Sequence, residues 1–195
     1  MHGLVNRSLQ AFLRQSYGAA LWQAAADAAG IGPDGFEPML TYPDPLTLAL
    51  AQAAADRLDK PRDALLEDMG GWLAAQEPLR RLLRFGGVDY PEFLKSLEDL
   101  PGRARLAVPD LALPDLRLTA RDGRLAVHVA GPAPLVEVFA PLFAGLFRAM
   151  ADDYGALAMI DLHRSRGGRR ISVQILASGW SPGRRFDLAQ PAGRG

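Results

Sequence analysis

The sequence predicts an α+β fold in which helices come first and an antiparallel sheet follows. Apolar residues recur at helical spacing from Leu4 to about residue 100. Beyond that point, Arg121-Asp122-Gly123-Arg124 is a strong two-residue hairpin signal, and Gly167-Gly168 marks a second turn between strand-like segments. A long apolar stretch separates the two turns. The order helices, hairpin, helix, hairpin therefore favours an antiparallel sheet over a parallel one.

The helical part divides at residues that start or stop helices. Residues 30–45 are rich in glycine and proline and predict a loop, and Gly30 suits the position after a helix end. Asp44-Pro45 provides an N-cap followed by proline at the first helical position, and Pro61 begins another helix in the same way. Helices are therefore expected over residues 4–13, 21–29, 46–59, 61–69, 78–85 and 91–100.

The part of the chain after Pro101 has a different pattern. Pro109 and Pro114 break any helix that would continue there. The segment 125–130 alternates, with Leu125, Val127 and Val129 on one face and Ala126, His128 and Ala130 on the other. Beyond it we expect a helix over residues 133–150 and an alternating strand over residues 171–175. Residues 179–195 are expected to form a flexible tail.

Composition and charge exclude several classes of function. The 195 residues include 22 basic and 22 acidic side chains, so no overall charge draws the chain toward nucleic acid or an anionic membrane. Cysteine is absent, which excludes disulfides, thiolate metal sites and cysteine nucleophiles. We find no signal peptide and no run of about eighteen uncharged apolar residues. A soluble cytoplasmic protein that binds neither nucleic acid nor membrane is therefore expected.

Several short motifs occur in a fixed order along the chain. They are Met1-His2-Gly3-Leu4-Val5-Asn6, Tyr42-Pro43-Asp44 with Thr47, Met69-Gly70-Gly71-Trp72, Pro91-Glu92-Phe93-Leu94 with Leu97 and Leu100, and the prolines Pro109 and Pro114. Together they resemble the motifs of the haem nitric oxide/oxygen binding (H-NOX) family, and the resemblance covers residues 1–178. It implies a helical subdomain over about residues 1–100. A proximal subdomain with a four-stranded antiparallel sheet and a packed helix would follow over about residues 101–178.

The resemblance also implies a chemistry. Members of the family hold a b-type haem between the two subdomains, sense nitric oxide or oxygen, and signal to a partner that is often a histidine kinase or a diguanylate cyclase. Their iron is held by a histidine that follows the pattern Phe-Leu-x-x-Leu-x-x-Leu. Here that position is Pro101, which has no donor atom and would tend to end or kink its helix. The family's Tyr-x-Ser-x-Arg motif, which binds the propionates, aligns with His128, Ala130 and Pro132.

Because both haem determinants are absent, the leading hypothesis is a haem-independent sensory or regulatory module without cofactor or metal. It would act on a signalling partner, with a small apolar ligand or packed side chains in the former haem pocket. The alternative is a haem-binding sensor of nitric oxide or oxygen in which His128 or His2 holds the iron. The positions that align with the family pocket are Val5, Leu97, Leu100, Pro101, Ala104, Ala112, Pro114, Leu116, His128, Ala130 and Pro132.

Two questions about this pocket stay open at the level of sequence. His128 would lie on the inward face of its strand if the resemblance holds, or it is a partly buried histidine that bonds to a neighbour. Aromatic side chains could fill the space that haem would take; they are Trp72, Phe85, Phe139, Phe143 and Phe147. Phenylalanines at helical spacing are more often core residues than a cofactor site.

We find no constellation of residues that predicts an enzyme. Gly179–Gly183 fits the pattern Gly-x-Ser-x-Gly, but Pro182 opposes the helix that a nucleophile elbow needs, and no histidine follows His163. The acidic pairs at residues 67–68 and 152–153 predict solvated surface. The basic run Arg164–Arg170 predicts either a solvated hairpin tip or a docking patch for an acidic partner or a nucleotide.

Overall fold

The structure, a computed structural model, describes residues 1–121 and 124–184. Its elements, in chain order, are α1 Gly3–Tyr17, α2 Ala19–Ala28, α3 Asp44–Arg57, α4 Arg62–Ala75, α5 Glu77–Arg84, α6 Tyr90–Ser96, the 3₁₀ turn η1 Leu97–Asp99, α7 Leu100–Ala107, β1 Asp115–Arg121, β2 Arg124–Ala130, α8 Ala133–Tyr154, β3 Leu157–Ser165 and β4 Gly168–Ala177. The predicted α+β class is thereby confirmed.

The four strands form one antiparallel sheet in the order β1-β2-β4-β3. Arg121 pairs with Arg124 across the predicted first hairpin, whose turn residues 122–123 lie outside the described part of the chain. The second hairpin joins β3 to β4 at Gly167, whose φ of 78° is the left-handed conformation that glycine adopts readily. Since β4 pairs with both β2 and β3, the two hairpins form one continuous sheet.

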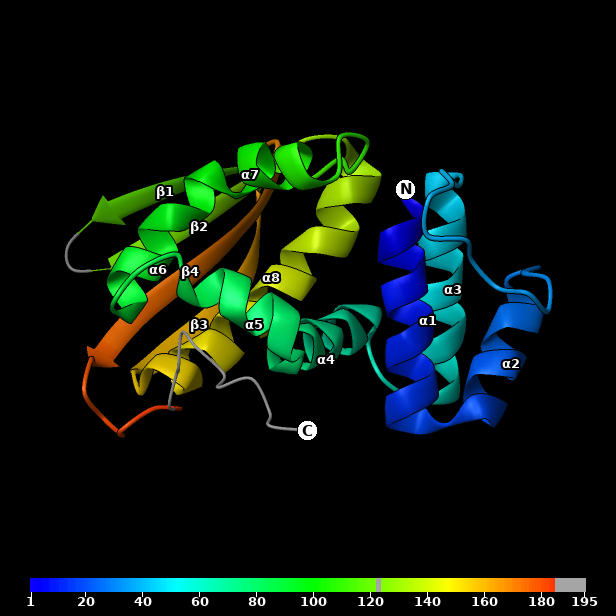
Figure 1. The fold of residues 1–195 in the computed structure, drawn as a ribbon, viewed down its shortest axis with the longest axis horizontal. Helices are drawn as coiled ribbons and strands as arrows, with labels where there is room; N and C mark the ends of the chain where they lie inside the picture. The colour runs from blue at the N-terminus through cyan, green and yellow to red at the C-terminus, as the bar shows by residue number, and fades with distance from the viewer. Residues whose placement is uncertain (122–123, 185–195) are drawn as a thin grey trace, which may run out of the picture.

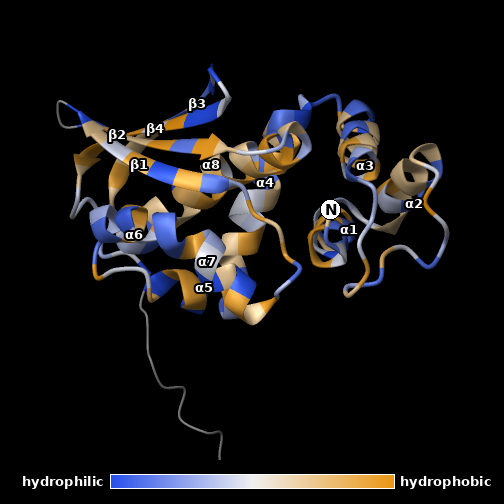
Figure 2. Cartoon of the chain, turned by 90° about the horizontal axis from the view of Figure 1, so that it is seen from above, coloured by the Kyte–Doolittle hydropathy of each residue, from blue (hydrophilic) through white to orange (hydrophobic). Residues whose placement is uncertain are grey.

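Helices cover the sheet on one face only (Figure 2). Helix α8 crosses that face, and the inward side chains Val127, Val129, Ile171 and Val173 are at most 1% exposed. Helix α4 packs on α8, whereas α1, α2 and α3 lie side by side at the far end of the molecule from the sheet (Figure 1). One continuous core joins the two ends of the molecule, because α1 and α3 contact α4 and α3 also contacts α8.

Helix α8 is long and apolar enough, by length and composition, to cross a membrane. In this fold 67% of its most apolar window is buried against the rest of the protein. That burial is typical of the central helix of a globular core, and it agrees with the packing of α8 between the sheet and α4.

The chain between residues 97 and 107 differs from the prediction. Pro101 was expected to end or kink the helix that starts near residue 91. Instead α6 ends at Ser96, η1 makes one turn, and α7 begins at Leu100 with Pro101 in its first turn. The missing N–H of proline leaves no helical hydrogen bond unmade at that position, so Pro101 starts a helix.

The segment after β4 is partly anchored. Ser181 N–H donates to the Gly155 carbonyl (3.1 Å), and Arg184 N–H donates to the Asp153 carbonyl (3.0 Å). The flexible tail predicted over residues 179–195 is therefore tied to the end of α8 up to residue 184. Residues 185–195 lie outside the described residues.

Candidate functional site

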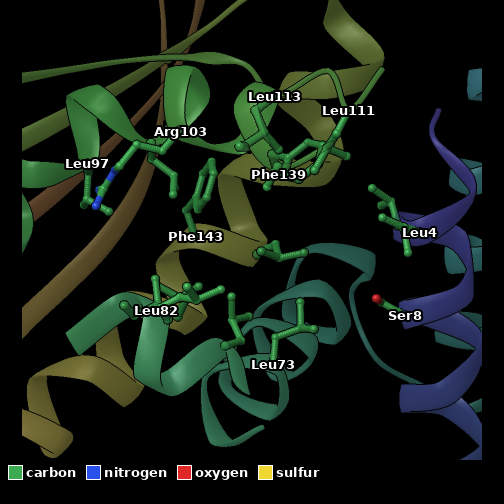
Figure 3. Close-up of a pocket in the computed structure, with 18 of the residues that line it drawn as sticks. Leu4, Ser8, Leu73, Leu82, Leu97, Arg103, Leu111, Leu113, Phe139 and Phe143 are labelled. Atoms are coloured by element: carbon green, nitrogen blue, oxygen red, sulfur yellow. The ribbon is translucent and has the colours of Figure 1, made fainter. Parts of the chain in front are cut away.

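An apolar cavity of about 380 Å³ lies where α1 faces the helices that cover the sheet (Figure 3). Its walls come from α1, α4, α5, α6, η1, α7, α8 and the segment before β1. The lining residues are Leu4, Val5, Ser8, Met69, Leu73, Leu79, Leu82, Leu83, Phe93, Ser96, Leu97, Leu100, Arg103, Ala104, Ala107, Val108, Leu111, Leu113, Phe139, Leu142, Phe143 and Leu146. Such a site suits an apolar ligand that is held by shape and by a few polar groups.

Helix α8 supplies one wall because of the spacing of its large residues. Phe139 lies three residues before Leu142 and four before Phe143, and Leu146 repeats these spacings from Phe143 and Leu142, so the four side chains share one face of the helix. The rings of Phe139 and Phe143 lie 5.8 Å apart between centroids. Both rings line the cavity and neither fills it, although the sequence allowed these aromatic residues to take the space of haem.

Polar groups are scarce along this cavity. Of the described lining residues only Ser8, Ser96 and Arg103 have polar side chains, and Arg103 carries the only charge. Its guanidinium lies toward Leu97 at the edge of the cavity and donates to the Ser96 carbonyl (2.9 Å) (Figure 3). Arg103 is exposed, so a ligand carboxylate at this edge could pair with it and stay in contact with water.

The predicted pocket residues separate into three groups in the structure. Val5, Leu97, Leu100 and Ala104 line the cavity. Pro114 and Leu116 are buried but do not line it. Pro101, which is buried, and Ala112, which is exposed, line a second, smaller pocket of about 210 Å³. Ala130 and Pro132 are exposed. Pro101, the position aligned with the family's iron ligand, therefore lines the smaller pocket and not the main cavity.

His128 is not on the inward face of its strand, contrary to what the resemblance implied. Val127 and Val129 are 1% exposed and face α8, so the period-two alternation places His128 on the outer face. There its ring Nε2 lies 3.1 Å from Thr119 Oγ1. The half-buried, neighbour-bonded histidine is the alternative that the structure supports.

The other two histidines do not line the cavity either. His2 is buried and caps α1, its Nδ1 accepting a hydrogen bond from the Leu4 N–H (3.2 Å). His163 is exposed, with its Nε2 3.0 Å from Ser172 Oγ on the outer face of the sheet. Within residues 1–121 and 124–184, no group of three or more histidine, cysteine, aspartate or glutamate side chains could hold a metal ion.

Asp153 was predicted to be solvated and is instead 4% exposed. Arg80 Nε donates to its Oδ1 (2.7 Å), and Arg84 Nε lies 3.6 Å from its Oδ2. The hydrogen bond to Asp153 is the main cause that raises the pKa of Arg80 above its ordinary value. The guanidinium of Arg84 also stacks 4.0 Å from the centre of the Tyr154 ring. This cluster joins α5 to the end of α8 and so supports the cavity wall that α5 provides.

Sequence reasoning missed two walls of the cavity. Helix α7 was not predicted, and with it Arg103, Ala107 and Val108 were overlooked. The leucines of α5 were predicted as helical but not as a wall. The helical spacing of Leu79, Leu82 and Leu83 beside three arginines was the available signal, because it marks an amphipathic helix.

Comparison with known proteins gives consistent matches. The model of the haem-NO-binding family (HNOB) matches residues 2–158. An H-NOX protein from S. oneidensis in the Fe(II) ligation state has a TM-score of 0.77, with 14% identity over 91% of this chain and 97% of that one. The Fe(II) unliganded H-NOX mutant A71G from K. algicida has a TM-score of 0.74, with 18% identity over 90% of this chain and 96% of that one. These likenesses show the fold.

Two curated relatives match part of the chain. Soluble guanylate cyclase gcy-31 of Caenorhabditis elegans is 26% identical over 118 residues, which is 58% of this chain and 17% of the relative. Soluble guanylate cyclase 89Db of Drosophila melanogaster is 23% identical over 130 residues, or 65% of this chain and 19% of the relative. The match thus covers less than a fifth of the length of either cyclase.

These findings correct the expectation that no cofactor belongs to this fold. The matching family is described as haem-NO-binding, and similar structures were solved in Fe(II) and Fe(II)NO states. Haem is therefore the cofactor to expect. Because proline has no donor atom, Pro101 opposes only iron ligation from that one position. Pro101 also does not line the cavity.

Proposed function

This chain belongs to the haem-NO-binding family, and from that premise we propose that it is a sensory domain that takes haem into the apolar cavity between α1, α5, α7 and α8. The cavity itself is the observation that supports the proposal. It has a volume of about 380 Å³, apolar walls, and one cationic side chain at its edge. A porphyrin is a flat apolar ring with two carboxylates, and it needs a site of that kind.

The residues present fit the ring better than they fit the iron. Leucine and phenylalanine side chains face the cavity, and Arg103 can pair with a propionate. By contrast, no histidine within the described residues lines the cavity, and His128 lies on the outer face of the sheet. The iron ligation of the family is therefore not reproduced, and we assign no chemical step to the iron. His2, which lies two residues before cavity residue Leu4, stays a proposal as an unorthodox ligand.

The domain is proposed to regulate a signalling partner rather than to catalyse a reaction. Its curated relatives are named soluble guanylate cyclases, and the match covers less than a fifth of each. Their names support a soluble protein in a signalling context. A diguanylate cyclase or a histidine kinase as partner, a location in the cytoplasm, and residues 1–178 as the domain remain our predictions from the resemblance.

Titration of the purified apo-protein with haemin tests the proposal. We expect one saturable haem per chain, seen as a Soret band distinct from that of free haemin. Ala104→Trp would place a large ring in the cavity and should abolish this band. Arg105→Trp is the matched control, because Arg105 lies on the same helix but lines the smaller pocket instead. Absence of a saturable band, or equal binding by Ala104→Trp, would overturn the proposal.

A further inference from the structure

A row of basic side chains crosses the outer face of the sheet, which no helix covers (Figure 2). Arg117 on β1 pairs with His128 on β2, His128 pairs with Arg170 on β4, and Arg170 pairs with His163 on β3. Directly paired residues of antiparallel strands share a face, so the four side chains stand in one line. We call this line the basic row.

The basic row has no counter-charge among the described residues that bond to it. Arg117 and Arg170 are exposed, and no described side chain forms an ion pair or hydrogen bond with either of them. Arg169 differs, because it turns inward and donates to Asp63 (2.7 Å). The histidines bond to neutral hydroxyls, His128 to Thr119 and His163 to Ser172. The run Arg164–Arg170 is thus divided between the two faces of the sheet, and its outward arginine joins the row.

The surface next to the basic row is hollowed and also positive. A depression of about 1010 Å³ on this face includes His128, His163 and Arg170 of the row, together with Arg121 and Arg124. Asp161 is the single carboxylate among its described lining residues. An anionic group that binds there would meet three arginines and one carboxylate among the described lining residues, so attraction should exceed repulsion.

The same face also exposes apolar side chains, which favours a protein partner over a nucleic acid. Met159, which is 54% exposed, lines the depression, and Leu176, which is 51% exposed, follows the depression along β4. Protein surfaces that bind nucleic acid are strongly basic, whereas the whole chain here has no net charge. Neighbouring strands lie about 4.8 Å apart, so the row repeats at that interval. Carboxylates at positions i, i+4 and i+7 of a helix, with its rise of about 1.5 Å per residue, lie at similar intervals.

We propose that the basic row is the docking surface for an acidic amphipathic helix of a protein partner, which lies across the four strands and places its carboxylates on Arg117 and Arg170. The proposal rests on the proposed signalling function only in that a sensory domain needs a partner. The surface lies on the opposite face of the sheet from the haem cavity, so the two proposals can fail separately.

The test uses the full chain and a defined probe. The probe is a fluorescent helical peptide with glutamates at i, i+4 and i+7 and leucines beside them, and its binding is measured by fluorescence anisotropy. We expect Arg117→Glu with Arg170→Glu to weaken binding by at least about tenfold, and binding to weaken as salt rises. Backbone amide shifts in ¹⁵N-labelled protein should change along β1, β2 and β4.

Two matched controls separate this surface from net charge. Arg14→Glu with Arg57→Glu changes the charge by the same amount at exposed arginines of α1 and α3, away from the sheet, and should bind the peptide within about twofold of wild type. Equal loss in both double variants would overturn the proposal, as would tighter binding of a duplex DNA of equal charge than of the peptide. A haemin titration of the sheet variant should be unchanged, so failure of the cavity proposal would be seen independently.

Discussion

Gly70 on α4 and Gly145 on α8 each lie against the backbone of the other helix, so the two helices cross without a side chain between them at that point. A Cβ on Gly70 would lie 2.0 Å from the Leu142 carbonyl oxygen, and a Cβ on Gly145 would lie 1.8 Å from the Glu67 carbonyl oxygen. Backbone atoms cannot move aside as a flexible side chain can. The separation of α4 and α8, and with it the width of the cavity between them, therefore depends on these two glycines.

Gly70→Ala should destabilise the fold by about 2–3 kcal/mol, because the added methyl forces the helices apart. Urea unfolding followed by circular dichroism measures the change. Gly71→Ala is the matched control: nothing lies within 4 Å of its Cβ, and alanine in a helix interior should stabilise by up to about 1 kcal/mol. Equal stability of the two variants would contradict the close crossing.

Asp153→Asn should be costly although it changes few atoms. It would leave Arg80 and Arg84 beside a neutral group in a place where Asp153 is 4% exposed, and removal of one partner from a buried ion pair costs about 3–5 kcal/mol. Because Arg80 is held mainly by this carboxylate, the end of α5 should loosen first, which hydrogen exchange of α5 amides would detect. Asp152→Asn, at the exposed neighbouring position, should change the free energy of unfolding by no more than about 0.5 kcal/mol.

Much of the fold could be predicted from the sequence because its signals are local. The hairpin residues, the alternation in β2 and the apolar period of α8 each depend on neighbours within a few positions. Leu97 and Leu100 were likewise placed at the pocket, and both lie in the wall of the cavity. Helix α7 was missed because Pro101, Pro109 and Pro114 dominate the local signal there, and proline in a first turn is compatible with a helix.

The remaining features of the site depend on residues far apart in the chain. Asp153 is buried only because Arg80 and Arg84, about seventy positions earlier, come to meet it, and no local pattern reports such a partner. His128 was expected to face inward because the family motif at that position binds haem. The alternation in β2 only separates His128 from Val127 and Val129, and it is the apolar valines that pack against α8.

Stability should fall at alkaline pH because of a buried tyrosine. Burial raises the pKa of Tyr90 well above its ordinary value, and its hydroxyl donates to the Phe147 carbonyl (3.0 Å). The folded state thus keeps the proton that the unfolded chain loses above about pH 10, so this contribution is complete below pH 10 and is lost as the pH rises further. Burial also raises the pKa of Tyr154 in the same direction.

Urea unfolding of Tyr90→Phe and wild type at several pH values tests this expectation. At neutral pH the variant should be less stable by about 1 kcal/mol, since the Phe147 carbonyl loses its hydrogen bond. Above about pH 10 the difference should shrink, because only the wild type has a buried hydroxyl to ionise on unfolding. A difference that stays constant with pH would show that Tyr90 ionises equally in both states.

Haem affinity should rise when a histidine is placed on the wall of the cavity rather than at the aligned family position. Leu100 lines the cavity, whereas Pro101 faces the smaller pocket. Leu100→His should therefore bind haemin more tightly than wild type, by about tenfold for each 1.4 kcal/mol of added ligation, and shift the Soret band. Pro101→His is the comparison and should leave both unchanged. Tighter haemin binding by Pro101→His than by Leu100→His would contradict this expectation. It would mean that the first turn of α7 rotates toward the cavity when haem binds, so that Leu97, Leu100 and Ala104 no longer form the same wall.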